Sequence, residues 1–127
     1  MNDPIADMFI QIQNAQNAQK KTLDVEFSKV KMAILNILKE SQKINNFREI
    51  VDKRRPAVKK IEIELSQKGS LIKRISRPGR RVYVSGSRIP RPKSPRGLLI
   101  LSTSEGMMTG EEARKKGLGG EIIGEVI

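Results

Sequence analysis

The stretch that decides the fold of the C-terminal half reads Leu98-Leu99-Ile100-Leu101-Ser102-Thr103-Ser104-Glu105-Gly106. Its first four residues form the most apolar run of this half, and such a run predicts a buried strand. Three hydroxyl residues and a glycine follow, where that strand should reach the surface. We call Ser102–Gly106 the hydroxyl turn. Its short side chains suit either an ordinary closing turn or hydrogen bonding to a polar partner.

The overall composition excludes several kinds of protein. The chain has 127 residues, enough for one typical domain or two small ones. It has no cysteine and no histidine, so disulfides, thiolate metal sites and the commonest general base are absent. No apolar run approaches the roughly 20 residues of a membrane span, and the polar N-terminus is unlike a secretory signal. We expect a cytoplasmic protein without a metal or cofactor, which does not contact membranes.

Positive charge is concentrated in the middle third of the chain. The net charge is +11, yet the span from Leu65 to Ser104 contains no Asp or Glu. This distribution favours a polyanionic partner, most often nucleic acid, because solubility alone would be served by mixed charges. Tyr83 lies inside the span and either packs on a sheet or stacks on an unpaired base. The basic residues of the span are Lys68, Lys73, Arg74, Arg77, Arg80, Arg81, Arg88, Arg91, Lys93 and Arg96.

The N-terminal half predicts a helix–strand–helix–strand–strand order. Asp3-Pro4 is typical of a helix start, and Ile5, Met8, Phe9 and Ile12 form one apolar stripe. Ser28 should cap the second helix, and its expected buried residues are Val30, Ala33, Ile34, Ile37 and Leu38. The other expected elements are a first helix ending at Lys20-Lys21 and strands over 22–27, 44–51 and 58–65.

The C-terminal half predicts a mainly β domain with one short helix. Thr109 and Glu112 have the spacing of a capping box, and Gly117 suits the helix C-terminus. Prolines between Ser85 and Gly97 indicate an extended loop and not a strand. Strands are expected over 71–75, 80–84, 98–101 and 121–123. The fold class is therefore α+β, with an N-terminal α/β domain over 1–67, a polar turn at 67–70, and a C-terminal β-rich domain over 68–127, whose charge favours nucleic acid.

Two short motifs have ordinary structural explanations. Ser28-Lys29-Val30-Lys31 matches the S-x-x-K of serine-lysine hydrolases, but the companion motifs are missing and Ser28 suits a helix cap. Gly117-Leu118-Gly119-Gly120 matches the GXXG loop of KH modules. That loop joins two helices, whereas here it would join a helix to a strand, where a C-cap and a close backbone approach explain the glycines. We expect no enzymatic activity.

Longer motifs, in order along the chain, resemble the small-subunit ribosomal protein S-eight family of bacteria. The C-terminal string from Ser102 to Thr109, followed by Ala113-Arg114 and by Gly117 to Glu121, resembles that family closely. The resemblance covers essentially the whole chain. Further matches are Asp3 to Met8, Asn14-Ala15, Ser28-Lys29 with Lys31, Ser76 to Gly79, Arg81 to Tyr83, and Ile89-Pro90.

The resemblance implies a structural constituent of the small ribosomal subunit. Such a protein binds a helical junction in the central domain of small-subunit rRNA and supports early assembly beside neighbouring ribosomal proteins. It could also bind its own mRNA. The alternative is a non-ribosomal RNA chaperone or translational repressor that uses the same surface. The RNA-binding residues implied are Ser102, Thr103, Ser104, Gly106, Tyr83, Arg77, Gly119, Gly120, Glu121, Asn14, Lys29 and Lys31.

Some of these residues have more specific expected roles, and a few positions differ from the family's pattern. We expect Glu121 to orient the hydroxyl turn, while Asn14, Lys29 and Lys31 make secondary contacts. Glu105 stands where the family often has lysine, which implies less attraction for phosphate at the turn. Gln11 and Gln13 stand where basic residues often flank Asn14, which implies a weaker contact from the first helix.

Overall fold

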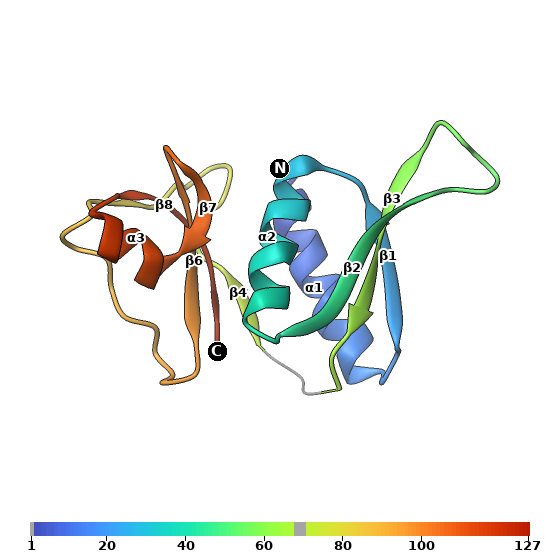
Figure 1. The fold of residues 1–127 in the computed structure, drawn as a ribbon, viewed down its shortest axis with the longest axis horizontal. Helices are drawn as coiled ribbons and strands as arrows, with labels where there is room; N and C mark the ends of the chain where they lie inside the picture. The colour runs from blue at the N-terminus through green and yellow to red at the C-terminus, as the bar shows by residue number, and fades with distance from the viewer. Residues whose placement is uncertain (1, 68–70) are drawn as a thin grey trace. The chain divides into compact units, whose positions relative to one another are not determined.

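A computed structural model describes residues 2–67 and 71–127 of the chain (Figure 1). It divides into two compact units: an N-terminal unit, Ile10–Gly69, and a C-terminal unit, Ser70–Ile127 together with Met1–Phe9. The domains predicted over 1–67 and 68–127 differ from these units in the placement of the first nine residues. The polar turn predicted at 67–70 lies, after Gln67, outside the described residues.

Helix α1 spans Pro4–Asn17. The predicted cap is confirmed, because the Ala6 amide donates to Asp3 Oδ1 at 3.2 Å. The helix ends before the predicted Lys20-Lys21, since Gln19 takes a left-handed conformation with φ 58°. Its apolar stripe is buried at Met8, Phe9 and Ile12.

The N-terminal unit contains a three-stranded antiparallel sheet in the order β1-β3-β2. Alternate residues of β3, from Ile61 to Leu65, are buried, as the alternation in the sequence predicts. Helix α2 packs against β2 and covers one face of this sheet (Figure 1). The elements are β1 (Thr22–Glu26), α2 (Lys29–Glu40), β2 (Ile44–Val51) and β3 (Lys59–Leu65).

The buried face of α2 differs from the predicted one. Val30 is 45% exposed and Ala33 is half-buried, whereas Leu35 and Lys31 are buried. A lysine can bury its methylene stem when its ammonium finds a partner, and Lys31 Nζ donates to the Glu26 carbonyl at 3.1 Å. This bond ties the first turn of α2 to the end of β1. The predicted cap is confirmed, because the Lys31 amide donates to Ser28 Oγ at 3.0 Å.

The C-terminal unit is built on a five-stranded antiparallel sheet with β8 near its centre. One side of β8 pairs with β6, which pairs in turn with β7, and the other side is shared by β4 and β5. The strands are β4 (Ile72–Arg74), β5 (Tyr83–Val84), β6 (Leu98–Thr103), β7 (Gly106–Thr109) and β8 (Gly120–Val126). The α+β class is confirmed, but β7 was not predicted.

Helix α3 (Gly110–Lys116) covers one face of this sheet, as its contacts with β6 and β7 show. Both predicted caps are confirmed: Thr109 accepts from the Glu112 amide at 3.2 Å, and Gly117 takes the left-handed conformation with φ 68°. The core beneath the helix consists of Ile89, Leu99, Leu101, Met108, Ala113 and Ile122.

The proline-rich segment 85–97 contains no strand, as predicted. It is nevertheless fixed to the rest of the unit. Arg114 Nη2 donates to the Ile89 carbonyl at 3.1 Å, and the Lys93 amide donates to Oε2 of the buried Glu125 at 2.8 Å. These bonds hold both halves of the loop against α3 and β8.

Candidate RNA interface

The hydroxyl turn connects β6 to β7 as a tight hairpin. The register pairs Thr103 with Gly106, so Ser104 and Glu105 form the connection. The Thr103 hydroxyl donates to the Gly106 carbonyl at 2.9 Å and accepts from the Glu105 amide at 3.1 Å. Gly106 has φ 109°, a conformation that side chains other than glycine rarely adopt. Thr103 and Gly106 therefore close the turn.

The two serines of the hydroxyl turn are differently placed. Ser104 is exposed and Ser102 is half-buried. Within residues 2–67 and 71–127, neither hydroxyl forms a hydrogen bond. Both are therefore available to an external donor or acceptor, while Thr103 is committed to the turn.

Tyr83, Glu121, Ser102 and Met107 form one row across four strands. Tyr83 pairs with Glu121, Glu121 with Ser102, and Ser102 with Met107. The sequence neighbours of these residues pack into the core under α3. Because side chains alternate between the faces of a strand, this row faces away from α3.

Tyr83 is the most exposed large side chain of this row. Tyr83 is 68% exposed, which favours the alternative that its ring is available for stacking over the alternative that it packs on the sheet. Strands lie about 4.8 Å apart, which places Tyr83 roughly 10 Å from Ser102 across β8. The face thus offers an aromatic ring at one end and a hydroxyl group near the other.

Glu121 anchors the middle of the row. Ser76 Oγ donates to Glu121 Oε2 at 2.5 Å, and Arg81 Nη1 donates to the same oxygen at 3.0 Å. Ser76 is fully buried and accepts from the Val82 amide at 3.0 Å. The Glu121 main chain pairs with Ser102, so its influence on the hydroxyl turn passes through the strand pairing and not through its carboxylate.

These contacts shift the ionisation of both charged groups. Burial opposes ionisation of Glu121, but the hydrogen bonds from Ser76 and Arg81 and the charges of Arg81 and Arg74 together lower its pKa. The hydrogen bond to Glu121 correspondingly raises the pKa of Arg81. Glu121 is therefore ionised at neutral pH and holds the segment 76–82 against β8.

The glycines before β8 are explained by the backbone. An added Cβ at Gly120 would lie 2.1 Å from the Ser102 carbonyl oxygen, and one at Gly119 would lie 2.4 Å from the Val84 oxygen. Gly117 caps α3. The segment therefore joins a helix to a strand with close backbone approaches, and the KH interpretation is wrong.

Only part of the acid-free span presents free positive charge. Arg74 is buried in an ion pair with Asp3 at 3.2 Å, and Arg81 is paired with Glu121. Arg77 is exposed at a tight turn in which its amide and that of Arg80 donate to each other's carbonyls. Its guanidinium has no ion pair or hydrogen bond within the described residues, and its contact with RNA stays a prediction.

Glu105, at the tip of the hydroxyl turn, lies 4.0 Å from Lys116 Nζ. Both side chains are more than half exposed, so this ion pair contributes little to stability. It does place a cation of α3 beside the one carboxylate that would repel phosphate at the turn.

The three residues of the N-terminal unit that were expected to contact RNA differ in how exposed they are. Asn14 on α1 and Lys29 at the start of α2 are exposed. Lys31 is buried and its ammonium is bonded to Glu26, a position that favours a structural role. Because Ser28 and Lys31 are both explained by the capping of α2, nothing in their geometry supports the hydrolase interpretation.

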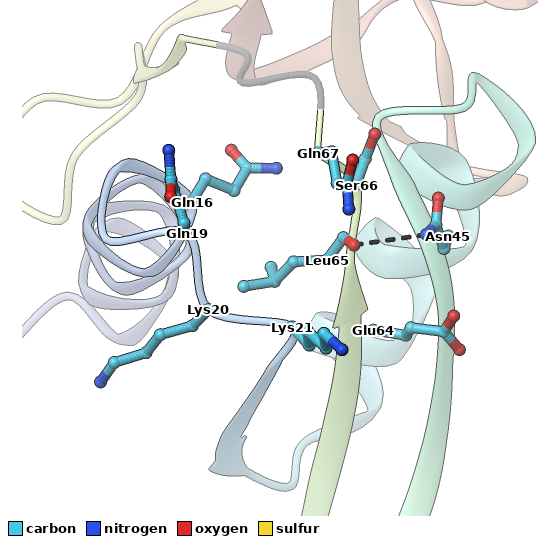
Figure 2. Close-up of a pocket in the computed structure, with 9 residues that line it drawn as sticks. All are labelled: Gln16, Gln19, Lys20, Lys21, Asn45, Glu64, Leu65, Ser66 and Gln67. Atoms are coloured by element: carbon cyan, nitrogen blue, oxygen red, sulfur yellow. Dashed lines mark hydrogen bonds between the residues drawn. The ribbon is translucent and has the colours of Figure 1, made fainter.

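A polar hollow of about 570 Å³ lies in the N-terminal unit between the end of α1 and the end of β3 (Figure 2). Asn45 Nδ2 donates to the Leu65 carbonyl at 3.3 Å on one side of it. Gln16 lies on the other side, and its buried Oε1 has no partner within the described residues. The lining residues are Gln16, Gln19, Lys20, Lys21, Asn45, Glu64, Leu65, Ser66 and Gln67.

Sequence reasoning missed two residues that build this interface, Ser76 and Arg81. A buried serine five positions before an arginine gives no signal by itself, because the Glu121 that binds both lies about 40 residues later. Among the described residues there is no group of three potential metal ligands. No helix within the described ranges is long and apolar enough to cross a membrane.

The fold and this surface define a basic α+β protein with a polar face on its C-terminal sheet. The family model described as "Ribosomal protein S8" matches residues 3–127. A small ribosomal subunit protein uS8 from Kosmotoga olearia is 43% identical, covering 96% of both chains. The same-named proteins of Natranaerobius thermophilus and Geobacter metallireducens are 42% and 41% identical, each covering 97% of this chain and 96% of the relative.

The chain therefore belongs to the ribosomal protein S8 family. This confirms the resemblance found in the sequence. Members of this family are structural components of the ribosome and not enzymes.

Proposed function

We propose that this protein is a structural constituent of the small ribosomal subunit that binds the central domain of small-subunit rRNA directly and supports early assembly. The observation that carries the proposal is the sheet face on which Tyr83 presents an exposed ring, and Ser102 and Ser104 present hydroxyls that have no hydrogen bond within the described residues. Family membership supplies the ribosomal context. The ribosome is then its location in the cytoplasm, and neighbouring small-subunit proteins are its further partners.

The chemistry of this face suits structured RNA. Aromatic side chains stack on bases that are displaced from a helix, and short hydroxyls reach 2′-OH groups and base edges in the shallow minor groove. Arg77 adds a guanidinium near the same edge of the sheet, where it would pair with phosphate. The hydroxyls thus provide shape recognition, and the basic residues provide attraction that does not depend on sequence. A messenger segment that folds like the rRNA site would bind the same face.

The test compares Ser104→Ala with the unchanged protein on two RNAs, a central-domain rRNA fragment and an unrelated duplex. We expect the variant to lose one net hydrogen bond, about 0.5–1.5 kcal/mol, on the rRNA fragment alone. The dissociation constant for the unrelated duplex, divided by that for the rRNA fragment, should therefore fall roughly 2- to 10-fold. An unchanged ratio would show that the serine does not recognise the fragment.

Sedimentation distinguishes the ribosomal role from that of a free RNA chaperone or repressor. In sucrose gradients at moderate salt, the protein should remain with small subunits. If it is found only in the light fractions while still binding RNA, the alternative role is correct.

A further inference from the structure

The hairpin between β2 and β3 extends away from the rest of the N-terminal unit as a projecting arm (Figure 1, green). We call Val51–Val58 the basic arm. All its residues except Asp52 are exposed, including the apolar side chains of Val51 and Val58. In the sequence, this segment joins the strands expected over 44–51 and 58–65.

Asp52 fixes the conformation of the arm. Its Oδ1 accepts from the Arg54 amide at 2.9 Å, and its carbonyl accepts from the Arg55 amide at 3.1 Å. The Asp52 amide donates to the Val58 carbonyl at 3.1 Å, and the Val58 amide donates to the Arg55 carbonyl at 2.8 Å. The loop is therefore closed by its own backbone, which holds the side chains at its tip outward.

Three consecutive cations, Lys53, Arg54 and Arg55, occupy that tip. Their side chains have no ion pair or hydrogen bond within residues 2–67 and 71–127. The basic residues at the base of the arm differ, since Lys59 pairs with Glu49 at 3.4 Å and Lys60 lies 3.8 Å from Asp52. Three adjacent cations that have no partner within the described residues thus lie together at the tip of the arm.

We propose that the basic arm is a second RNA contact, which binds the phosphate backbone of small-subunit rRNA through Lys53, Arg54 and Arg55. This inference rests on the proposed function, because rRNA is taken as the partner. Like charges at adjacent positions repel one another, and phosphates relieve that repulsion. Two guanidinium groups offer paired donors that match phosphate geometry. The tip has no aromatic or hydroxyl side chain, so the contact is independent of base sequence.

The first test removes the charge of the tip with the combined substitution Lys53→Gln, Arg54→Gln and Arg55→Gln. Asp52 is retained so that the loop stays closed. Three lost phosphate contacts should reduce the slope of log affinity against log salt for full-length small-subunit rRNA by about 2 to 3. The matched control is Lys20→Gln, Lys21→Gln and Lys39→Gln, which removes equal charge from exposed positions of the same unit.

The control should change the slope by less than about 0.5. Equal effects of the two triple variants, or no effect of the arm variant, would overturn the inference. Ser104→Ala is measured in parallel to keep the two proposals separate. If it weakens rRNA binding while the arm variant does not, only the arm inference fails, and if the unchanged protein does not bind rRNA specifically, the proposed function fails.

The second test identifies what the arm contacts. The chain has no cysteine, so Ala57→Cys provides a single thiol on the arm for a photoactivatable crosslinker. In reconstituted small subunits we expect crosslinks to rRNA, reduced several-fold when the three charges are also removed. Crosslinks to a ribosomal protein in place of RNA would overturn the inference.

Discussion

At the scale of single residues, the hydroxyl turn separates into structural and available groups. Thr103 and Gly106 close the hairpin, whereas the hydroxyls of Ser102 and Ser104 form no bond within the described residues. On the same face, the Glu121 carboxylate accepts hydrogen bonds from Ser76 and Arg81. This carboxylate therefore holds the segment before Tyr83 against β8, and β8 is joined to Ser102 of β6 by the strand pairing.

The low pKa of Glu121 predicts how stability depends on pH. Its stabilising contribution is fully present above the unfolded-state value of a glutamate, about 4.3, and is lost as pH falls through the lower folded-state pKa. Glu121→Gln keeps an acceptor for Ser76 but removes the charge. We expect it to reduce the free energy of unfolding by about 1 kcal/mol at pH 7. The difference in the free energy of unfolding between Glu121→Gln and the unchanged protein should become smaller towards pH 3.

Urea unfolding at several pH values between 3 and 7 measures this difference. Glu64→Gln is the control, because Glu64 is exposed and its side chain has no bond in the described part of the chain. A difference for Glu121→Gln that stays constant with pH would mean that the negative charge is not what stabilises the fold.

At the scale of elements, much of the fold was predictable because its signals are local. The caps at Asp3, Ser28 and Thr109 and the alternation of β3 each depend on residues within a few positions, and all are confirmed. Strand β7 was missed because Gly106–Thr109 is short and follows a turn. The face of α2 was misjudged because Lys31 was treated as a surface residue, although a bond to a nonadjacent carbonyl allows it to be buried.

The candidate site was less predictable, because strands distant in sequence create it. The sequence identified Tyr83, Ser102 and Glu121 separately. Only the order β5-β8-β6 brings them into one row. No periodicity within a strand specifies which strand will be its neighbour, so the partners of Glu121 could not be predicted either.

The close contact between β8 and β6 predicts that Gly120→Ala disrupts the row. The added Cβ would lie 2.1 Å from the Ser102 oxygen, and the two strands would have to separate. We expect a loss of about 2–3 kcal/mol in the free energy of unfolding, together with weaker RNA binding because Ser102 moves.

Urea unfolding measures the loss, and Gly117→Ala is the matched control. Gly117 has no atom within 4 Å of its added Cβ, so only its left-handed φ is penalised, by about 1–2 kcal/mol. That variant should bind RNA normally. If Gly120→Ala were as stable as the unchanged protein, the strands would have to be less tightly spaced than the structure has them.

At the scale of the whole molecule, charge is the property that the two units share. The net charge is +11, and the structure neutralises part of the acid-free span within the C-terminal unit, at Arg74 and Arg81. The basic arm adds three cations that have no partner within the described residues of the N-terminal unit. Attraction to RNA is therefore distributed over both units, while the groups suited to recognising a particular RNA shape are concentrated around Tyr83, Ser102 and Ser104.

This separation of charge attraction from shape recognition predicts how Arg91→Ala binds RNA. The substitution removes one exposed cation of the proline-rich segment. A residue that contacts phosphate affects all RNAs alike, so affinity for the rRNA fragment and for an unrelated duplex should fall by the same factor. The slope of log affinity against log salt should decrease by roughly 0.7–0.9 on both. Filter binding at several salt concentrations measures both quantities, with Lys39→Ala as a control of equal charge. A loss confined to the rRNA fragment would assign Arg91 to recognition, and would extend the specific interface from the hydroxyl turn to the proline-rich segment.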